Sequence, residues 1–202
     1  MSRTSLDPPY QWLTVARPAV HSAGPDHSTK VAGMRVLFVC TGNICRSPTA
    51  ERLAAAFARE GGFELTASSA GTQGLTGHAM DPTAATVLTQ LGGDPDGFVA
   101  RRLTPAIAAD ADLVLTMTAA HRDAVLALAP RQMRRTFTLL EASGLAAASG
   151  AQSIATLADA RAVHRVDTLD IGDPYRRDHS VYEQAGELIA QTLPHVLRLS
   201  TQ

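Results

Sequence analysis

The sequence predicts an α/β fold in which a parallel β-sheet carries helices on both faces. Short apolar and β-branched runs, such as RVLFVC (35–40) and DLVLTM (112–117), have the composition of buried parallel strands. Segments with a helical spacing of apolar residues alternate with these strands, as a parallel sheet requires. The chain has 202 residues, and because domains commonly contain about 100–200 residues, one main domain is expected.

The domain is predicted to begin with a strand, a loop and a helix. The strand at 35–40 precedes a helix over SPTAERLAAAFARE (47–60), in which Ser47 is the expected N-cap and Pro48 occupies the first helical position. A second strand is expected over FELTASSAG (63–71), because this run ends in a turn of small residues.

The middle of the chain continues this alternation. Asp81-Pro82 marks the start of a helix through about Leu91, and Thr104-Pro105 marks the start of a short third helix. A third strand follows at 112–117. A fourth helix (119–129), which Pro130 stops, and a fourth strand, RTFTLL (135–140), come next.

The two ends of the chain are less regular. Residues 1–33 are rich in Pro, Ser, His and Asp without a sustained period, which predicts a disordered extension ahead of a domain at 34–202. Met34 directly precedes the first strand, which favours it as an alternative translation start. Residues 142–170 are rich in Ala, Ser and Gly and predict a surface insertion of helix and loop. A C-terminal helix is expected over 181–199, interrupted at Pro194.

Composition and charge exclude several classes of partner. Apolar residues make up 45% of the chain and charged residues 18%, as in a globular protein with a sizeable core. The net charge of -1 gives no electrostatic reason to expect nucleic acid or a membrane surface. No apolar stretch approaches the roughly 18–20 residues of a membrane helix. We therefore expect a monomer that binds neither nucleic acid nor membranes.

Both cysteines of the chain, Cys40 and Cys45, stand in one loop. A disulfide between two cysteines of one loop would not connect distant parts of the fold. No other cysteine is present to complete a zinc site, and no histidine stands at ligand spacing from the pair. The remaining interpretation is a reactive thiol in a reducing compartment. The sequence thus predicts a cytoplasmic protein without a metal or cofactor.

The stretch VCTGNICRSP (39–48) has the features of an anion-binding loop between a strand and a helix. The helix N-terminus offers unpaired N–H groups, Gly42 and Asn43 allow a tight turn, and Arg46 supplies a planar fork for phosphate oxygens. Cys40 would lie at the floor of this loop, where the helix N-terminus, the arginine and a hydrogen bond from Ser47 favour the thiolate. The loop thus predicts phosphoryl transfer through a cysteine.

A nucleotide-binding P-loop is excluded. That motif needs Gly-Lys followed by Ser or Thr, and the only lysine is Lys30, in the N-terminal segment. The bare spacing Cys-x5-Arg is a weak signal by itself. The order of apolar strand, Gly-Asn, Arg-Ser-Pro and helix start makes the motif specific.

The run VLFVCTGNICRSPTAE resembles the signature of the low-molecular-weight protein tyrosine phosphatases. SSAGT (68–72), DLVLTM and DPY (173–175) extend the resemblance from about Met34 to the C-terminal helix. The resemblance implies a flavodoxin-like three-layer sandwich with a central four-stranded parallel sheet. It also implies hydrolysis of phosphotyrosine in proteins through a phosphocysteine.

The same resemblance implies roles for residues of the site. Cys40 would be the nucleophile, Arg46 the phosphate clamp and Asp173 the general acid, a role that a carboxylic acid in a polar turn stiffened by Pro174 can fill. The predicted substrate- and phosphate-binding residues are Thr41, Gly42, Asn43, Ile44, Cys45, Ser47, Tyr175 and Leu75.

The walls of the substrate slot depart from the family pattern. Tyr175 would supply one aromatic wall, whereas Leu75 stands where members that prefer phosphotyrosine often carry an aromatic residue. An aliphatic wall accepts an aryl ring less selectively.

Several residues near these motifs have two possible interpretations. Cys45 is either a small buried residue or, as the resemblance implies, a redox partner of Cys40. His78 and His121 are interpreted as structural or surface groups. Arg101 and Arg102 are expected to tie a loop to the edge of the sheet.

Two alternative functions remain. An arsenate reductase uses such a loop but needs cysteines beyond Cys45, and the chain has none. A catalytically silent phosphate-binding module is the other alternative, against which the intact set of Cys40, Arg46 and Asp173 argues.

Overall fold

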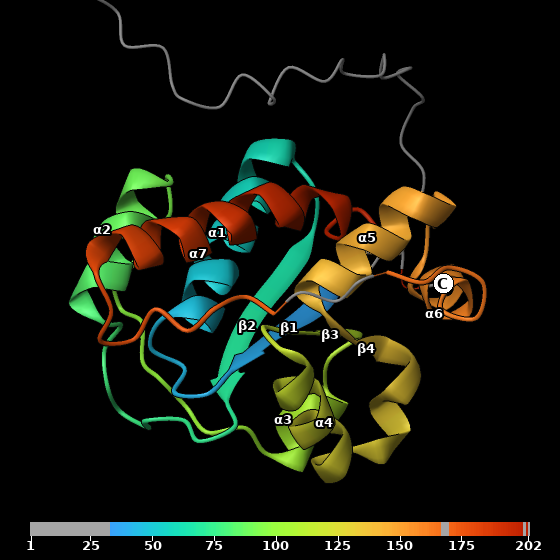
Figure 1. Cartoon of the computed structure of the whole chain (residues 1–202), viewed down its shortest axis with the longest axis horizontal. Helices are drawn as coiled ribbons and strands as arrows, with labels where there is room; N and C mark the ends of the chain where they lie inside the picture. The colour runs from blue at the N-terminus through green and yellow to red at the C-terminus, as the bar shows by residue number, and fades with distance from the viewer. Residues whose placement is uncertain (1–32, 167–169, 200, 202) are drawn as a thin grey trace, which may run out of the picture. The chain divides into compact units, whose positions relative to one another are not determined.

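A four-stranded parallel sheet forms the centre of the protein in a computed structural model that describes residues 33–166, 170–199 and 201 (Figure 1). All neighbouring strands are parallel, in the order β2-β1-β3-β4. Their bounds are β1 Met34–Cys40, β2 Leu65–Gly71, β3 Leu113–Thr116 and β4 Thr136–Thr138. This sheet confirms the predicted fold class. The extension predicted over 1–33 lies, except for Gly33, outside the described residues.

Helices cover both faces of the sheet (Figure 1). On one face, Phe38 and Leu115 pack in a large core with apolar residues of five helices: α1 Arg46–Gly61, α2 Pro82–Gln90, α5 Leu139–Ser149, α6 Ile154–Ala160 and α7 His179–Thr192. On the other face, Leu37 and Val114 pack against two helices: α3 Pro105–Ala109 and α4 Ala119–Leu128. Neighbouring residues of a strand therefore enter opposite cores, because strand side chains alternate between faces.

Two predicted boundaries need correction. Helix α1 begins at Arg46 with Cys45 in the N-cap position, so Ser47 is not the N-cap. The Ser47 hydroxyl instead hydrogen-bonds to side chains of the preceding loop. The fourth strand ends at Thr138 rather than at 140, because Thr138 and Glu141 form a capping box that starts α5.

The C-terminal helix is interrupted near Pro194, as predicted. Helix α7 ends at Thr192, and the chain continues as a 3-10 turn over Leu193–His195, with a further 3-10 segment earlier at Pro130–Arg135. A proline inside a helix lacks the N–H that the α-helical ladder needs.

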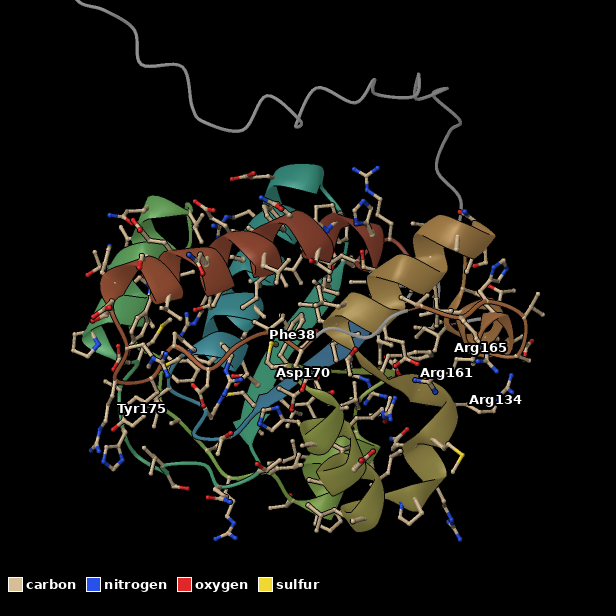
Figure 2. The ribbon with its side chains drawn as sticks, viewed as in Figure 1. Phe38, Arg134, Arg161, Arg165, Asp170 and Tyr175 are labelled. Atoms are coloured by element: carbon tan, nitrogen blue, oxygen red, sulfur yellow. The ribbon has the colours of Figure 1, made fainter. Side chains whose placement is uncertain are left out.

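The segment at 142–170, expected to be a surface insertion, contributes to the core. Leu145 of α5 and Leu157 of α6 are almost completely buried. Arg161 joins α6 to the sheet edge: its guanidinium lies 3.9 Å from the Phe137 ring centroid and donates to the Thr136 carbonyl at 2.6 Å (Figure 2). Because this carbonyl belongs to β4 at the edge of the sheet, the arginine protects an edge strand. Residues 167–169 of this segment lie outside the described residues.

Candidate active site

The loop between β1 and α1 lies at the carboxyl edge of the sheet, where open α/β sheets bind ligands. Cys40 ends β1 and is buried. Asn43 has a φ of 57°, the left-handed conformation that asparagine tolerates better than most residues. Gly71 ends β2 beside this loop, and a Cβ there would overlap the Thr41 carbonyl oxygen. The tight curl of the loop therefore depends on a residue without a side chain on the neighbouring strand.

The amide groups of the loop are available to a ligand. Among the described residues, no acceptor is found for the backbone N–H groups of residues 41–46. These groups belong to a loop and a helix N-terminus, where consecutive amides form concave anion sites. The arrangement suits a tetrahedral anion above Cys40.

Asn43 connects the loop to the rest of the site. Its side-chain amide donates to the Ser47 hydroxyl at 2.9 Å and to the Ser69 hydroxyl at 2.7 Å. Its side-chain oxygen accepts from the Arg101 backbone N–H at 2.9 Å. The Arg101 side chain donates to the Ser69 carbonyl of β2 at 2.7 Å, which ties the segment that carries Arg101 to the sheet. Ser69 stands within the SSAGT motif, and no local pattern in the sequence indicates that it reaches this loop.

The hydrogen bonds around Ser47 orient its hydroxyl. Because Asn43 donates to Ser47, the proton of Ser47 is free to point at the Cys40 sulfur, 3.0 Å away. Ser47 thus contacts the Cys40 sulfur and does not cap the helix.

Arg46 begins α1 directly after the loop and is 4% exposed. It donates to the Ile171 carbonyl at 3.0 Å, and another nitrogen pairs with the Asp173 carboxylate at 2.7 Å. Its Nε is buried without a hydrogen-bond partner. A buried donor left unpaired costs about 1–3 kcal/mol, so a bound anion that accepts from Nε would remove this cost.

The segment before α7 carries Asp173. The Ile171 backbone N–H donates to the Met117 carbonyl, and the Asp170 carboxylate accepts from the Ala119 N–H at 2.8 Å (Figure 2). These bonds hold the segment against the carboxyl end of β3. The Asp173 side chain is 53% exposed and also accepts from the Tyr175 N–H at 3.2 Å. It is therefore held at Arg46 while still open to solvent.

Leu75 and Tyr175, the predicted walls of the slot, are both partly exposed. The Leu75 N–H donates to the Gly42 carbonyl, and a Cβ at Gly42 would contact the side chains of Ile44 and Leu75. These two aliphatic side chains therefore lie together beside the loop. Tyr175 lies on the segment before α7, and the Arg176 guanidinium is 5.1 Å from its ring centroid (Figure 2).

The two cysteines have different environments. Both are free thiols in the structure. Burial raises the pKa of Cys45 well above its usual range, and the nearby Asp81 carboxylate adds to this effect. Cys45 therefore stays a thiol at neutral pH and is a poor nucleophile. Cys40 is therefore the candidate nucleophile of the loop.

His121 belongs to the site, which its sequence context did not indicate. Its Nε2 is 2.9 Å from the Thr41 hydroxyl and its Nδ1 is 2.8 Å from the Thr118 hydroxyl. Burial, with the nearby positive charge of Arg46, lowers the pKa of His121 to about 4. The imidazole is therefore neutral at physiological pH. The chain turn that places it beside Thr41 has no signature in the sequence.

The neutral His121 predicts a loss of stability in acid. Its pKa is about 4 in the folded protein and about 6.5 in the unfolded chain. The unfolded state therefore binds more protons between these values, and stability falls as the pH drops from 6.5 to 4, by roughly 2–3 kcal/mol. Urea unfolding of the parent and of His121→Gln at pH 4 and 7 measures this effect. A parent that loses no more stability in acid than the variant would contradict it.

The described part of the chain contains no group of three or more His, Cys, Asp or Glu side chains arranged to hold a metal. It also contains no helix that is long and apolar enough to cross a bilayer. The elements of the site are thus a buried cysteine, a loop of open amides, a buried arginine and a carboxylate. Together with the fold, they define an α/β protein whose cysteine-containing loop is suited to an anion.

Comparison with known proteins agrees with this definition. The family described as low molecular weight phosphotyrosine protein phosphatase matches residues 35–200. The chain belongs to this family. Etp of Escherichia coli K12, a low molecular weight protein-tyrosine-phosphatase, is 43% identical over 101 residues. This alignment covers 50% of the chain and 66% of Etp, just under two thirds of that relative.

Solved structures share the fold. The low molecular weight protein tyrosine phosphatase of T. tengcongensis is 30% identical, with a TM-score of 0.67 over 81% of this chain and 97% of that one. A YwlE arginine phosphatase mutant with a phosphorylated active-site serine is 27% identical, also with a TM-score of 0.67, over 81% of this chain and 93% of that one.

Proposed function

We propose that the protein hydrolyses phosphotyrosine in proteins through a phosphocysteine intermediate. Three observations of one loop carry this proposal: the buried Cys40 thiol at its start, the open amides of residues 41–46, and the unpaired Nε of Arg46 at its end. The family and the names of its members support a phosphotyrosine substrate. A reactive thiol also supports a cytoplasmic location.

The proposed reaction has two steps. In the first, the Cys40 sulfur attacks phosphorus, the bond from phosphorus to the tyrosine oxygen breaks, and Asp173 gives this oxygen a proton. In the second, Asp173 takes a proton from water, whose oxygen attacks phosphorus. The bond between phosphorus and sulfur breaks, and inorganic phosphate leaves with the thiolate restored.

The ion pair between Arg46 and Asp173 bears on the role of Asp173 in this cycle. The Asp173 carboxylate lies 2.7 Å from a terminal nitrogen of the Arg46 guanidinium. A bound phosphoryl group competes for the same guanidinium, because charge-assisted bonds from arginine to phosphate are strong. We propose that substrate binding separates Asp173 from Arg46 and frees it for proton transfer.

Asp173→Asn should lower kcat for a poor leaving group by roughly 10²–10⁴, the usual contribution of a positioned acid. The loss should be much smaller for p-nitrophenyl phosphate, whose leaving group needs little protonation. A series of substituted phenyl phosphates, measured in parent and variant, gives the dependence of kcat on the leaving-group pKa. An equal loss across the series would mean that Asp173 is not the general acid.

The substrate class can be tested directly. A phosphotyrosine peptide and a phosphoarginine peptide of the same sequence should differ in kcat/KM, with phosphotyrosine preferred. Phosphoarginine is the relevant comparison because one structural relative is an arginine phosphatase. A preference for phosphoarginine would contradict the proposed substrate and leave the chemistry of Cys40 in place.

We also propose that Cys45 protects Cys40 from irreversible oxidation. The two side chains lie near each other, since Cys40 is among the groups that raise the pKa of Cys45. A sulfenic acid on Cys40, formed by peroxide, would react with the Cys45 thiol to give a disulfide and water, which a dithiol then reduces.

Peroxide should inactivate both the parent enzyme and Cys45→Ser, and a dithiol should restore the parent much more completely. The reason is that the variant has no second thiol to trap the sulfenic acid before further oxidation. Activity before peroxide, after peroxide and after the dithiol gives the recovered fraction. Equal recovery of the two proteins would leave Cys45 as a small residue that fills space beneath the loop.

A further inference from the structure

The imidazole of His121 joins two hydroxyl groups, one on the loop that carries the nucleophile and one at the start of α4. It lies 2.9 Å from the Thr41 hydroxyl and 2.8 Å from the Thr118 hydroxyl, and it is buried. Asp170 and Asp173 approach it from the segment before α7, and Arg46 approaches it from α1. His121 therefore lies among the charged groups of the site without belonging to the proposed reaction.

The hydrogen bonds at Thr118 indicate which ring nitrogen carries the proton. As the N-cap of α4, the Thr118 hydroxyl oxygen accepts from the His121 backbone N–H at 3.1 Å. Within the described residues, the only acceptor found for the proton of this hydroxyl is Nδ1 of His121. Donation from Thr118 leaves Nδ1 without a proton. A neutral imidazole then carries its proton on Nε2.

This tautomer decides whether the Thr41 hydroxyl can donate a hydrogen bond to a ligand. With a proton on Nε2, the ring donates to the Thr41 hydroxyl oxygen. The proton of Thr41 then points elsewhere, and no acceptor for it is found in the described part of the chain. In the other tautomer, Nε2 carries no proton, and the Thr41 hydroxyl would donate its hydrogen bond to Nε2. Thr41 directly follows Cys40 and begins the row of open amides.

We propose that His121 is a positioning residue that makes the Thr41 hydroxyl a further hydrogen-bond donor to the phosphoryl oxygens bound above Cys40. The chain of donors runs from the Thr118 hydroxyl to Nδ1, from Nε2 to the Thr41 oxygen, and from the Thr41 hydroxyl to the anion. The inference rests on the proposed function for its role in catalysis, but the donor chain and its effect on anion binding are independent of turnover.

The tautomer can be measured in the parent protein. Long-range 1H–15N NMR spectra at pH 7 distinguish a protonated ring nitrogen from an unprotonated one, and we expect His121 to be protonated on Nε2 alone. A proton on Nδ1 would overturn the proposal, because Thr41 would then donate to the ring. This measurement needs no variant and no substrate.

The second measurement is the affinity for inorganic phosphate. Thr41→Val should weaken phosphate binding by roughly 10–100-fold, the usual effect of a lost hydrogen bond to a charged group. Thr41→Ser should restore most of the affinity, because it keeps the hydroxyl. Equal affinity of the parent and Thr41→Val would overturn the proposal.

A double-mutant cycle tests whether His121 acts through Thr41. His121→Leu should weaken phosphate binding in the parent and have little effect in the Thr41→Val background. Equal effects in both backgrounds would mean that His121 does not act through Thr41. His195→Leu is the matched control, since His195 also contacts a hydroxyl, that of Ser143 at 2.9 Å, and is exposed in the 3-10 turn after α7. This control should leave phosphate affinity unchanged.

These measurements also test the role of His121 independently of the proposed enzyme activity. If the parent binds phosphate but does not hydrolyse aryl phosphates, the proposed enzyme activity fails, while the tautomer and the affinities still decide the role of His121. If the enzyme is active, kcat/KM for p-nitrophenyl phosphate should follow the same pattern across the five variants as phosphate affinity does.

Discussion

Cys40→Ser is expected to lower the hydrolysis of p-nitrophenyl phosphate by at least about 10⁴, close to complete loss, as removal of a catalytic nucleophile does. A serine hydroxyl at the end of β1 is a much weaker nucleophile than a cysteine sulfur, although it could keep the contact with the Ser47 hydroxyl. The substitution changes one atom at a buried position, and the variant should remain folded. Steady-state kinetics with circular dichroism measure both properties.

The matched control for Cys40→Ser is Cys45→Ser, which makes the same change of one atom at the start of α1. It should keep appreciable activity, because Cys45 stays protonated and does not attack phosphorus. Activity of Cys40→Ser within tenfold of the parent would rule out Cys40 as the nucleophile. Loss of activity in both variants with retained folding would indicate a role of the loop geometry instead.

Arg46→Lys is expected to lower kcat/KM by roughly 10²–10³, the effect of removing a donor that stabilises charge in the transition state. The guanidinium holds the Ile171 carbonyl and Asp173 at the same time and still has a free Nε. A single ammonium group cannot reproduce this planar set of donors. Kinetics with an aryl phosphate and inhibition by inorganic phosphate should both show the loss.

The control for this change is Arg59→Lys, an exposed arginine near the end of the same helix. It should match the parent in kcat/KM and in thermal unfolding. Arg46→Lys should also lower the unfolding temperature, because a lysine ammonium at this buried position cannot make all the hydrogen bonds of the guanidinium. Near-normal turnover of Arg46→Lys would show that Arg46 is not the phosphate clamp.

The alternation of strands and helices was readable from the sequence because it depends on local composition. Apolar runs such as 35–40 enter buried strands, and prolines at 82 and 105 mark the helix starts that the structure has. The burial of part of the segment 142–170 in the core could not be predicted. Small residues there lack a clear period, and the segment makes contacts between positions distant in sequence, such as the 2.7 Å bond from Arg161 to Glu141 across 20 positions.

The central loop of the site follows from the local sequence. Cys40, Asn43, Arg46 and Ser47 lie within eight consecutive positions, and a strand followed by a helix fixes their arrangement. Tertiary structure decided which distant groups support that loop. Ser69, Arg101 and His121 contact it from 26, 58 and 80 positions away. Hydrogen bonds over such separations depend on which strands become neighbours, and no local pattern of residues encodes that pairing.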